Sequence, residues 1–262
     1  SASVSESTAS SEASSTSVAA STEASAETAG ELTTVNAGKL TMSTNAAFPP
    51  YEMTDDNGNY VGIDIEVAQA IADKLGLELQ VDDMDFDAAL LAAQSGKSDM
   101  VMAGVTVTEE RQTVMDFSNT YATGIQVVIV PEDSDIASID DMTGKMIGVQ
   151  RGTTGDLYCS ASVEDGGFDE ENVTPYDNGL TAVQALMNGQ VDCVVIDNAP
   201  AQEFVAANPG LKILDTEYAN EEYAIGVAKG NTQLLDAING ALEELQADGT
   251  VQSIVDKYIT AE

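Results

Sequence analysis

Arg111 is the residue of this sequence best suited to hold a small charged ligand. It ends the segment AGVTVTEER, which follows an apolar stretch typical of a buried strand, and the chain has one other arginine and no histidine. A guanidinium group offers a planar fork of N–H donors that fits a carboxylate at two points. Gly104 and Thr106 leave room for a ligand and add backbone and hydroxyl partners. The segment predicts a carboxylate-binding site; a surface ion pair of Arg111 with Glu109 or Glu110 is the alternative.

The composition excludes several classes of function. The chain has 262 residues, with 45 acidic against 9 basic residues and a formal net charge of −36. Such a charge repels nucleic acids and anionic lipid headgroups, so we expect neither as a direct partner. The absence of histidine removes histidine-based catalytic triads and most zinc sites, and we predict no catalytic residue, no metal and no cofactor. Cys159 and Cys193 lack metal-site spacing, which leaves a disulfide and two buried free thiols as alternatives.

Residues 1–37 are predicted to be a disordered tether. Ser, Ala, Thr and Glu dominate this stretch, and such a composition buries too little apolar surface to offset the entropy of ordering. A terminus without a tethering role is the alternative. No apolar run reaches the roughly 18 residues that span a bilayer. The absence of a leader segment predicts either a cytosolic protein or one whose leader has been removed.

After the tether, the sequence alternates between strand and helix patterns. Amphipathic spacing marks the helices, together with caps such as Asp85 and Asn178 and with terminal glycines. We expect strands at 39–44, 77–81, 99–102, 126–130, 145–149, 191–196, 211–214 and 223–227, and helices at 63–75, 86–94, after 155, and at 178–187, 234–247 and 251–259. This alternation, in two runs that divide near residue 125, predicts an α/β protein with two lobes, each a mainly parallel sheet flanked by helices. The segment DDNGN at 55–59 lacks the spacing of a calcium loop and predicts a tight turn.

Several short motifs occur together in a characteristic order. They are GIDIE at 62–66, MDF at 84–86, AGxTxTxxR at 103–111, DFS at 116–118, GTTG at 152–155, VD at 191–192 and Asp197. In this order and spacing they resemble the polar amino-acid solute-binding proteins of ABC importers (bacterial extracellular solute-binding protein family 3). The likeness covers residues 39–262, and it is strongest to glutamine-binding members.

The resemblance implies a two-lobed periplasmic-binding-protein fold of type II, with two hinge crossovers. Lobe 1 would comprise residues 38–124 and 223–262, and lobe 2 would comprise residues 125–222, with the ligand in the cleft between them. A monomer of this kind captures a free polar amino acid by cleft closure and delivers it to the permease of an ABC transporter. A ligand-sensing domain of a receptor and a dehydratase-type enzyme on the same fold are the alternatives.

The resemblance also assigns roles to residues of this chain. Arg111 would hold the α-carboxylate of the ligand, with help from Thr106, the backbone of Gly104 and the backbone N–H of Thr154, while Asp197 would hold the α-ammonium. Phe48 and Phe86 would flank the ligand side chain, and Ala103, Asn45 and Gln150 complete the predicted site. From the residues alone, Asp197 fits a helix N-cap equally well, and both phenylalanines fit ordinary core packing.

Two positions bear on which amino acid is bound. Asn45 stands where the family often has an acidic residue, and Gln150 stands where glutamine binders have lysine. An uncharged, amide-lined pocket favours a neutral polar ligand such as glutamine. Arginine and histidine stay open, because Glu52 is near in sequence and its orientation is not set by the pattern. The resemblance and the Ser-rich tether together predict an extracytoplasmic protein, namely a cell-surface lipoprotein of a Gram-positive-type bacterium, with the periplasm as the alternative.

Overall fold

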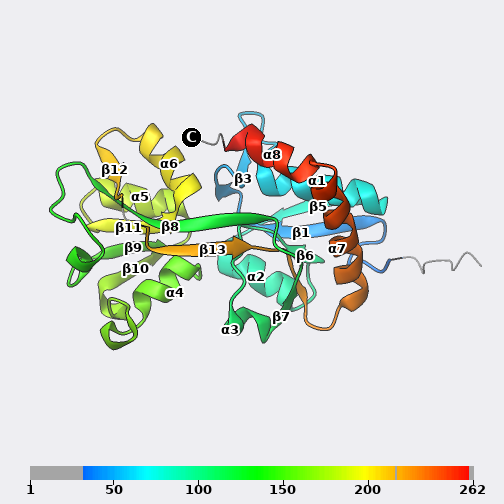
Figure 1. Cartoon of the computed structure of the whole chain (residues 1–262), viewed down its shortest axis with the longest axis horizontal. Helices are drawn as coiled ribbons and strands as arrows, with labels where there is room; N and C mark the ends of the chain where they lie inside the picture. Colours follow the sequence, from blue (N-terminus) through cyan, green and yellow to red (C-terminus); the bar gives the residue numbers. More distant parts are fainter. Residues whose placement is uncertain (1–31, 216, 260–262) are drawn as a thin grey trace, which may run out of the picture. The chain divides into compact units, whose positions relative to one another are not determined.

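A computed structural model gives the structure of the chain and describes residues 32–215 and 217–259. Most of the predicted tether, residues 1–31, lies outside the described residues. The described part contains two larger sheets flanked by helices and one small sheet of three strands (Figure 1).

The first large sheet has five strands in the order β5-β1-β6-β14-β7. They are β1 (Lys39–Thr44), β5 (Glu78–Asp83), β6 (Met100–Val101), β7 (Met115–Phe117) and β14 (Gly226–Ala228). Strand β1 is parallel to β5 and β6, whereas β14 is antiparallel to β6 and β7. Its helices are α1 (Ile63–Leu75), α2 (Phe86–Gln94), α3 (Glu109–Gln112), α7 (Thr232–Ala247) and α8 (Thr250–Tyr258). In Figure 1, α1 and α8 lie above this sheet and α2 lies below it.

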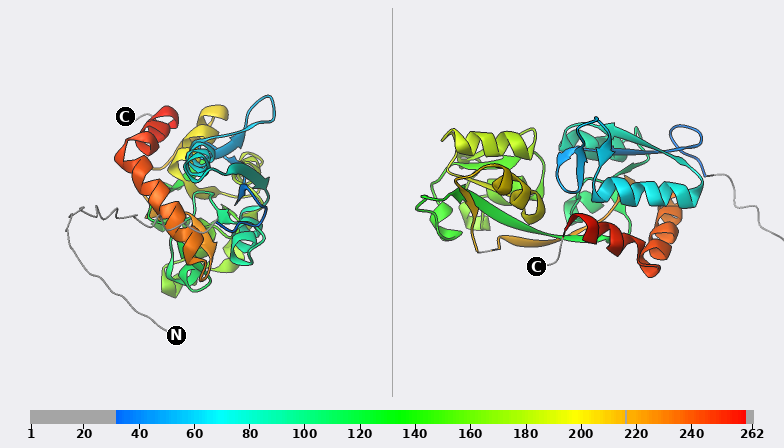
Figure 2. Two further views of the ribbon diagram at one scale, coloured as in Figure 1. Left: turned by 90° about the vertical axis from the view of Figure 1, so that its right-hand side faces the viewer. Right: turned by 90° about the horizontal axis from the view of Figure 1, so that it is seen from above.

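The second large sheet has the order β10-β9-β11-β8-β12, and a further strand, β13, pairs with β8. The strands are β8 (Ala122–Pro131), β9 (Ile147–Gln150), β10 (Val173–Tyr176), β11 (Cys193–Asp197), β12 (Leu211–Ile213) and β13 (Ala219–Tyr223). Helices α5 (Gly179–Met187) and α6 (Asn198–Ala207) lie above it in Figure 1, and α4 (Thr154–Ser160) lies below. The chain passes from the first sheet to the second through β8 and returns through β13, and these two strands run side by side (Figure 2).

The small sheet links the first large sheet to α1. It consists of β2 (Ala47–Phe48), β3 (Glu52–Thr54) and β4 (Tyr60–Val61). The predicted tight turn lies between β3 and β4, where Gly58 has a positive φ of 79° and its N–H donates to the carbonyl of Asp55. This hairpin fixes the direction of β3 and therefore the face of the small sheet on which the side chain of Glu52 lies.

The predicted α/β class is confirmed, with one correction. Both large sheets are mainly parallel, as predicted: β14 alone runs against the other strands of the first sheet, and β8 alone runs against the other strands of the second. The single strand predicted at 223–227 is wrong: β13 ends at Tyr223, β14 begins at Gly226, and the two belong to different sheets. A continuous apolar pattern cannot show that the chain changes sheet within it. The lobe boundaries at 124/125 and 222/223 stay a prediction. All strands of the first large sheet lie either before residue 118 or after residue 225.

Helix α1 begins after a glycine that no other residue can replace without strain. Gly62 has φ 126° and ψ 175°, a conformation that is essentially confined to glycine, and an added Cβ would overlap the carbonyl oxygen of Tyr51. We expect Gly62→Ala to destabilise the protein by about 1–3 kcal/mol or more in urea unfolding. Gly240 lies inside α7 with open space around its missing Cβ, so the control Gly240→Ala should stabilise by about 0.5–1 kcal/mol. Equal stability of both variants would contradict this account.

Candidate functional site

A central pocket is lined by residues of the second large sheet, by residues of the small sheet and by segments that follow strands of the first large sheet. All of the residues predicted to form a binding site line it: Asn45, Phe48, Phe86, Ala103, Gly104, Thr106, Arg111, Gln150, Thr154 and Asp197. Six further residues complete the lining: Glu52, Gln126, Thr153, Ile196, Glu221 and Tyr223. The structure thus brings together residues that are more than 150 positions apart in the sequence. Their roles toward a ligand stay a prediction.

Arg111 is held in this pocket by backbone carbonyls. Its side chain is 6 % exposed, Nη1 donates to the carbonyl of Thr106 at 2.8 Å, and Nη2 donates to the carbonyl of Gly152 at 3.0 Å. None of the ion pairs between described residues involves Arg111. The alternative of a surface pair with Glu109 or Glu110 is therefore wrong. Because its two bonds go to neutral carbonyls, the guanidinium has no ion-pair partner among the described residues and keeps further N–H donors.

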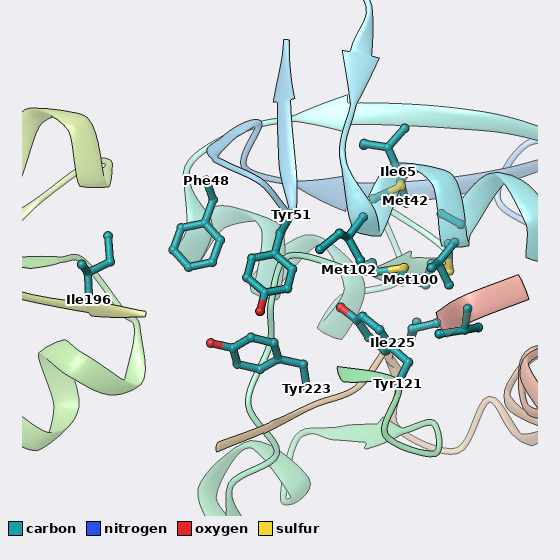
Figure 3. Close-up of a cluster of buried hydrophobic side chains, with 14 of the residues drawn as sticks. Met42, Phe48, Tyr51, Ile65, Met100, Met102, Tyr121, Ile196, Tyr223 and Ile225 are labelled. Carbon is teal, nitrogen blue, oxygen red and sulfur yellow. The ribbon is translucent and has the colours of Figure 1, made fainter. Parts of the chain in front are cut away.

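Aromatic side chains form one wall of the pocket. The guanidinium carbon of Arg111 lies 5.5 Å from the ring centre of Phe86, within the range of a cation–π contact. Phe48 stacks on Tyr51 with ring centres 5.7 Å apart, and Tyr51 meets Tyr223 edge to face at 5.4 Å. Figure 3 shows Phe48, Tyr51 and Tyr223 side by side, with Ile196 on the ribbon of the second sheet. Phe48 and Phe86 therefore serve core packing and also present ring surface to the pocket.

Asp197 caps helix α6 and faces the same pocket. Its Oδ1 accepts from the backbone N–H of Ala199 at 2.7 Å, and its Oδ2 accepts from the hydroxyl of Tyr223. The predicted N-cap is thus present, and each oxygen retains a free lone pair. Burial raises the pKa of Asp197 to about 7, against the lowering effect of the bond from Tyr223. A cationic group in the pocket would favour its ionised form.

The backbone at Gly104 has one free polar group. Its N–H donates to Oδ2 of Asp64 at 2.8 Å, and the hydroxyl of Tyr121 donates to Oδ1 of the same carboxylate at 2.8 Å. Gly104 has φ 57°, and an added Cβ would lie 3.0 Å from the ring of Phe48. The carbonyl of Gly104 is therefore the partner that its backbone can offer to a ligand.

Asn45 and Gln150 bind each other across the pocket. Nε2 of Gln150, at the end of β9, donates to Oδ1 of Asn45 at 3.1 Å, and both residues are buried. Nδ2 of Asn45 donates in turn to the carbonyl of Met84 at 2.9 Å. This amide pair joins the first sheet to the second without any charge, and it leaves Oε1 of Gln150 without a partner.

Comparison with known proteins identifies the family. A family model described as bacterial extracellular solute-binding proteins, family 3, matches residues 40–261. The chain belongs to this family. A probable histidine-binding protein of Neisseria gonorrhoeae is 34 % identical over 233 residues, which cover 87 % of this chain and 85 % of that protein.

Solved structures of similar proteins agree with this assignment. An ancestral arginine-binding protein bound to arginine superposes with a TM-score of 0.79 at 44 % identity, covering 85 % of this chain and 98 % of the other. An ancestral arginine-binding protein bound to glutamine gives a TM-score of 0.79 at 43 % identity, covering 86 % and 99 %. The predicted periplasmic-binding-protein fold of type II is thus confirmed for this solute-binding protein.

Three buried residues with carboxylate or amide side chains line the pocket of this solute-binding protein but were not among the predicted site residues, and Glu52 was named only as a residue whose orientation the pattern does not set. Glu52 lies on β3, Gln126 on β8 and Glu221 on β13, and all three are buried. Glu221 accepts from the hydroxyl of Thr154 and from Nε2 of Gln126, the latter at 2.9 Å. By contrast, neither carboxylate oxygen of Glu52 has a hydrogen bond, and Oε1 of Gln126 has none. Their neighbours in sequence carry no motif, and only polar residues within otherwise apolar strands could have indicated them.

Other predicted features lie away from the pocket. Cys159 and Cys193 are buried free thiols in one apolar cluster of the second sheet, which agrees with one of the two alternatives. Within residues 32–215 and 217–259, no group of three or more acidic or cysteine side chains is arranged to hold a metal ion. In the same residues, no helix has the length and apolarity needed to cross a bilayer.

The buried carboxyl groups predict how the stability of the empty protein depends on pH. Burial raises the pKa of Asp64 from 3.8 to about 6 and that of Asp197 from 3.8 to about 7. Between pH 4 and 7 the folded state therefore binds more protons than the unfolded state, and stability must fall as pH rises through this window. Urea unfolding at several pH values, repeated at high salt to screen surface charges, measures the trend. Rising stability across this window would contradict the predicted burial of these groups.

Proposed function

We propose that this solute-binding protein captures a free amino acid with a cationic side chain, arginine first, and delivers it to the permease of an ABC transporter. The observation that carries the proposal is the position of Glu52. It is fully buried, it lines the central pocket together with Arg111 and Asp197, and neither of its carboxylate oxygens accepts a hydrogen bond. The pocket thus offers one site for a carboxylate and two for positive groups.

Arg111 and Asp197 would hold the part that all amino acids share. The free N–H donors of Arg111 fit an α-carboxylate, and the hydroxyl of Thr106 lines the pocket beside them. Asp197 and the carbonyl of Gly104 would accept from the α-ammonium. Arg111 lies in the lobe of the first sheet and Asp197 ends β11 of the second, so both contacts form together only when the cleft is closed.

Glu52 distinguishes between candidate side chains. Unpartnered acceptors in the pocket, the carboxylate of Glu52 and the carbonyl oxygens of Gln126 and Gln150, call for a ligand rich in donors. A guanidinium offers five N–H donors and a positive charge. The amide of glutamine offers two donors and adds one more acceptor, and it brings no positive charge to Glu52.

The preference for a neutral ligand drawn from Asn45 and Gln150 is therefore revised. These two amides bond to each other, so they close the pocket rather than define its charge, and the orientation of Glu52 favours the cationic alternative. Sequence similarity does not decide between a neutral and a cationic ligand, because structures of ancestral arginine-binding proteins have been solved with arginine and with glutamine. Isothermal titration with arginine, lysine, histidine, glutamine and citrulline tests the proposal. We expect arginine to bind most tightly; tighter binding of glutamine would refute the role of Glu52.

Asp197→Asn should weaken the binding of every amino acid far more than it lowers stability. Asparagine keeps the volume of the side chain and its ability to cap α6, but it removes the charge that pairs with the α-ammonium. Loss of one partner of a buried, hydrogen-bonded charge pair costs roughly 2–5 kcal/mol in binding. Nα-acetyl-arginine, which lacks the ammonium charge, should bind the parent protein as poorly as arginine binds the variant. Equal affinity of the parent for both ligands would show that Asp197 is only a cap.

We propose further that residues 38–124 and 223–262 move as one lobe against residues 125–222. We also propose that the protein works at the cell surface, where a lipid anchor holds it through its Ser-rich residues 1–31. Strands β8 and β13 join the two lobes and carry Gln126, Glu221 and Tyr223 into the pocket. Small-angle scattering of residues 38–262 with and without arginine tests closure, and fatty-acid labelling in the native cell tests the anchor.

A further inference from the structure

Glu52 is in direct contact with a second buried carboxyl group. Asp64, in the first turn of α1, is fully buried like Glu52, and the two carboxyl groups lie within hydrogen-bonding reach of each other. Two ionised carboxylates can only accept hydrogen bonds and repel each other, so this contact becomes a hydrogen bond only when one group carries a proton. A proton on one of the two groups therefore turns the contact between Glu52 and Asp64 into a hydrogen bond.

The surroundings of the pair supply no positive charge. The groups that face Glu52 and Asp64 are Asp83 at the end of β5, Asp197 at the end of β11, and the hydroxyls of Tyr51 and Tyr121. Arg111 lines the same pocket, but its guanidinium binds backbone carbonyls instead. No described lysine lines the pocket either. Among the described residues, the charge of the pair is thus balanced by a proton alone.

The contacts also show which carboxyl group holds the proton. Asp64 accepts one bond on each oxygen, from Tyr121 and from the N–H of Gly104, and it lies at the N-terminal end of α1, where an anion is favoured. Glu52 has no such donors. Burial and the neighbouring Asp64 raise the pKa of Glu52 well above its ordinary value, whereas that of Asp64 rises only to about 6. These contacts favour Glu52 as the carrier of the proton and Asp64 as its acceptor.

We propose that Glu52 and Asp64 together form a proton site in the empty cleft, and that a cationic ligand side chain replaces this proton when it binds. The inference rests on the proposed function, since it needs a cationic ligand to reach Glu52. On binding, the O–H bond of Glu52 breaks, the proton leaves to solvent or buffer, and N–H donors of the ligand bond to the freed carboxylate. Capture of the cation is thus an exchange against a proton, and below the pKa of the pair the affinity for arginine should fall by up to about tenfold per pH unit.

Calorimetry in buffers of different ionisation enthalpy counts the protons released. Arginine and citrulline are each titrated at pH 7 in phosphate, imidazole and Tris. The dependence of the binding enthalpy on the ionisation enthalpy of the buffer gives the number of protons released with each ligand. Citrulline has an uncharged ureido group in place of the guanidinium but the same α-ammonium group as arginine. Any proton that the α-ammonium releases from Asp197 is therefore counted with both ligands. We expect arginine to release up to about one proton more than citrulline.

Two variants assign this difference to the pair. In Glu52→Gln the additional proton should disappear, because glutamine cannot carry it. In the matched control Asp83→Asn, which changes an acidic neighbour outside the pocket, the additional proton should remain. Equal proton release for arginine and citrulline in the parent protein would overturn the inference and leave the proposed function intact. Failure of arginine to bind, while other amino acids bind, would overturn the proposed ligand and the inference with it.

Discussion

Arg111→Ala should abolish detectable amino-acid binding and leave a folded protein. Arg111 is 6 % exposed, and its guanidinium is fixed between the carbonyls of Thr106 and Gly152, in the orientation proposed for binding the α-carboxylate. Removal of one partner of such a desolvated charge pair costs roughly 2–5 kcal/mol, which is tens to thousands of fold in affinity. Isothermal titration measures the loss, and cooperative thermal unfolding of the variant shows that the fold remains.

The other arginine of the chain provides the matched control. Arg151 is exposed, lies 3.7 Å from Asp177 and does not line the pocket, so Arg151→Ala should bind as the parent does. Arg111→Lys keeps the charge but loses the planar fork, and it should also bind weakly. Near-normal affinity of Arg111→Ala would mean that the ligand lies elsewhere.

The sequence was sufficient for the parts of the site that local pattern determines. Arg111 follows a strand and a turn of small residues, Thr154 follows a glycine turn, and Asp197 ends an apolar strand. In an α/β protein, residues that follow the carboxyl ends of strands gather at one edge of each sheet. The family resemblance added Asn45, Phe48 and Phe86, and the structure places them all in one pocket.

The sequence was insufficient where tertiary pairing decides. Glu52 points into the pocket because a hairpin of two-residue and three-residue strands sets its side, and such short strands carry no register information of their own. Gln126 and Glu221 meet because β8 and β13 pair as antiparallel strands although 95 residues separate them. The pairing of Asn45 with Gln150 depends in the same way on how the two sheets face each other.

These contacts change the meaning of individual residues. From the pattern alone, two amides in place of a charged pair indicated a neutral pocket, since their orientation was unknown. The structure turns them toward each other and leaves Glu52, Gln126 and Gln150 with unused acceptor oxygens. We therefore attribute the proposed specificity to the groups without partners in the assembled pocket, which residue types at single family positions do not reveal.

Glu52→Gln should reverse the order of affinities for arginine and glutamine. The variant keeps the shape of the side chain but removes the only carboxylate of the pocket lining that has no hydrogen bond. Arginine would then bury its guanidinium without a counter-charge, which should cost roughly 2–5 kcal/mol relative to the parent protein. Glutamine has no positive side chain to pair with Glu52 in the parent protein, so it loses no charge pair in the variant.

Competitive thermal-shift titrations of parent and variant with both amino acids measure this reversal, because a tighter ligand stabilises the folded protein more at equal concentration. The matched control is Glu222→Gln, which changes an exposed glutamate on β13 that does not line the pocket and should leave both affinities unchanged. Unaltered arginine affinity in Glu52→Gln would show that the ligand side chain does not reach Glu52, whatever holds its α-carboxylate. A parallel loss for both ligands would show that Glu52 supports the pocket rather than selects its ligand.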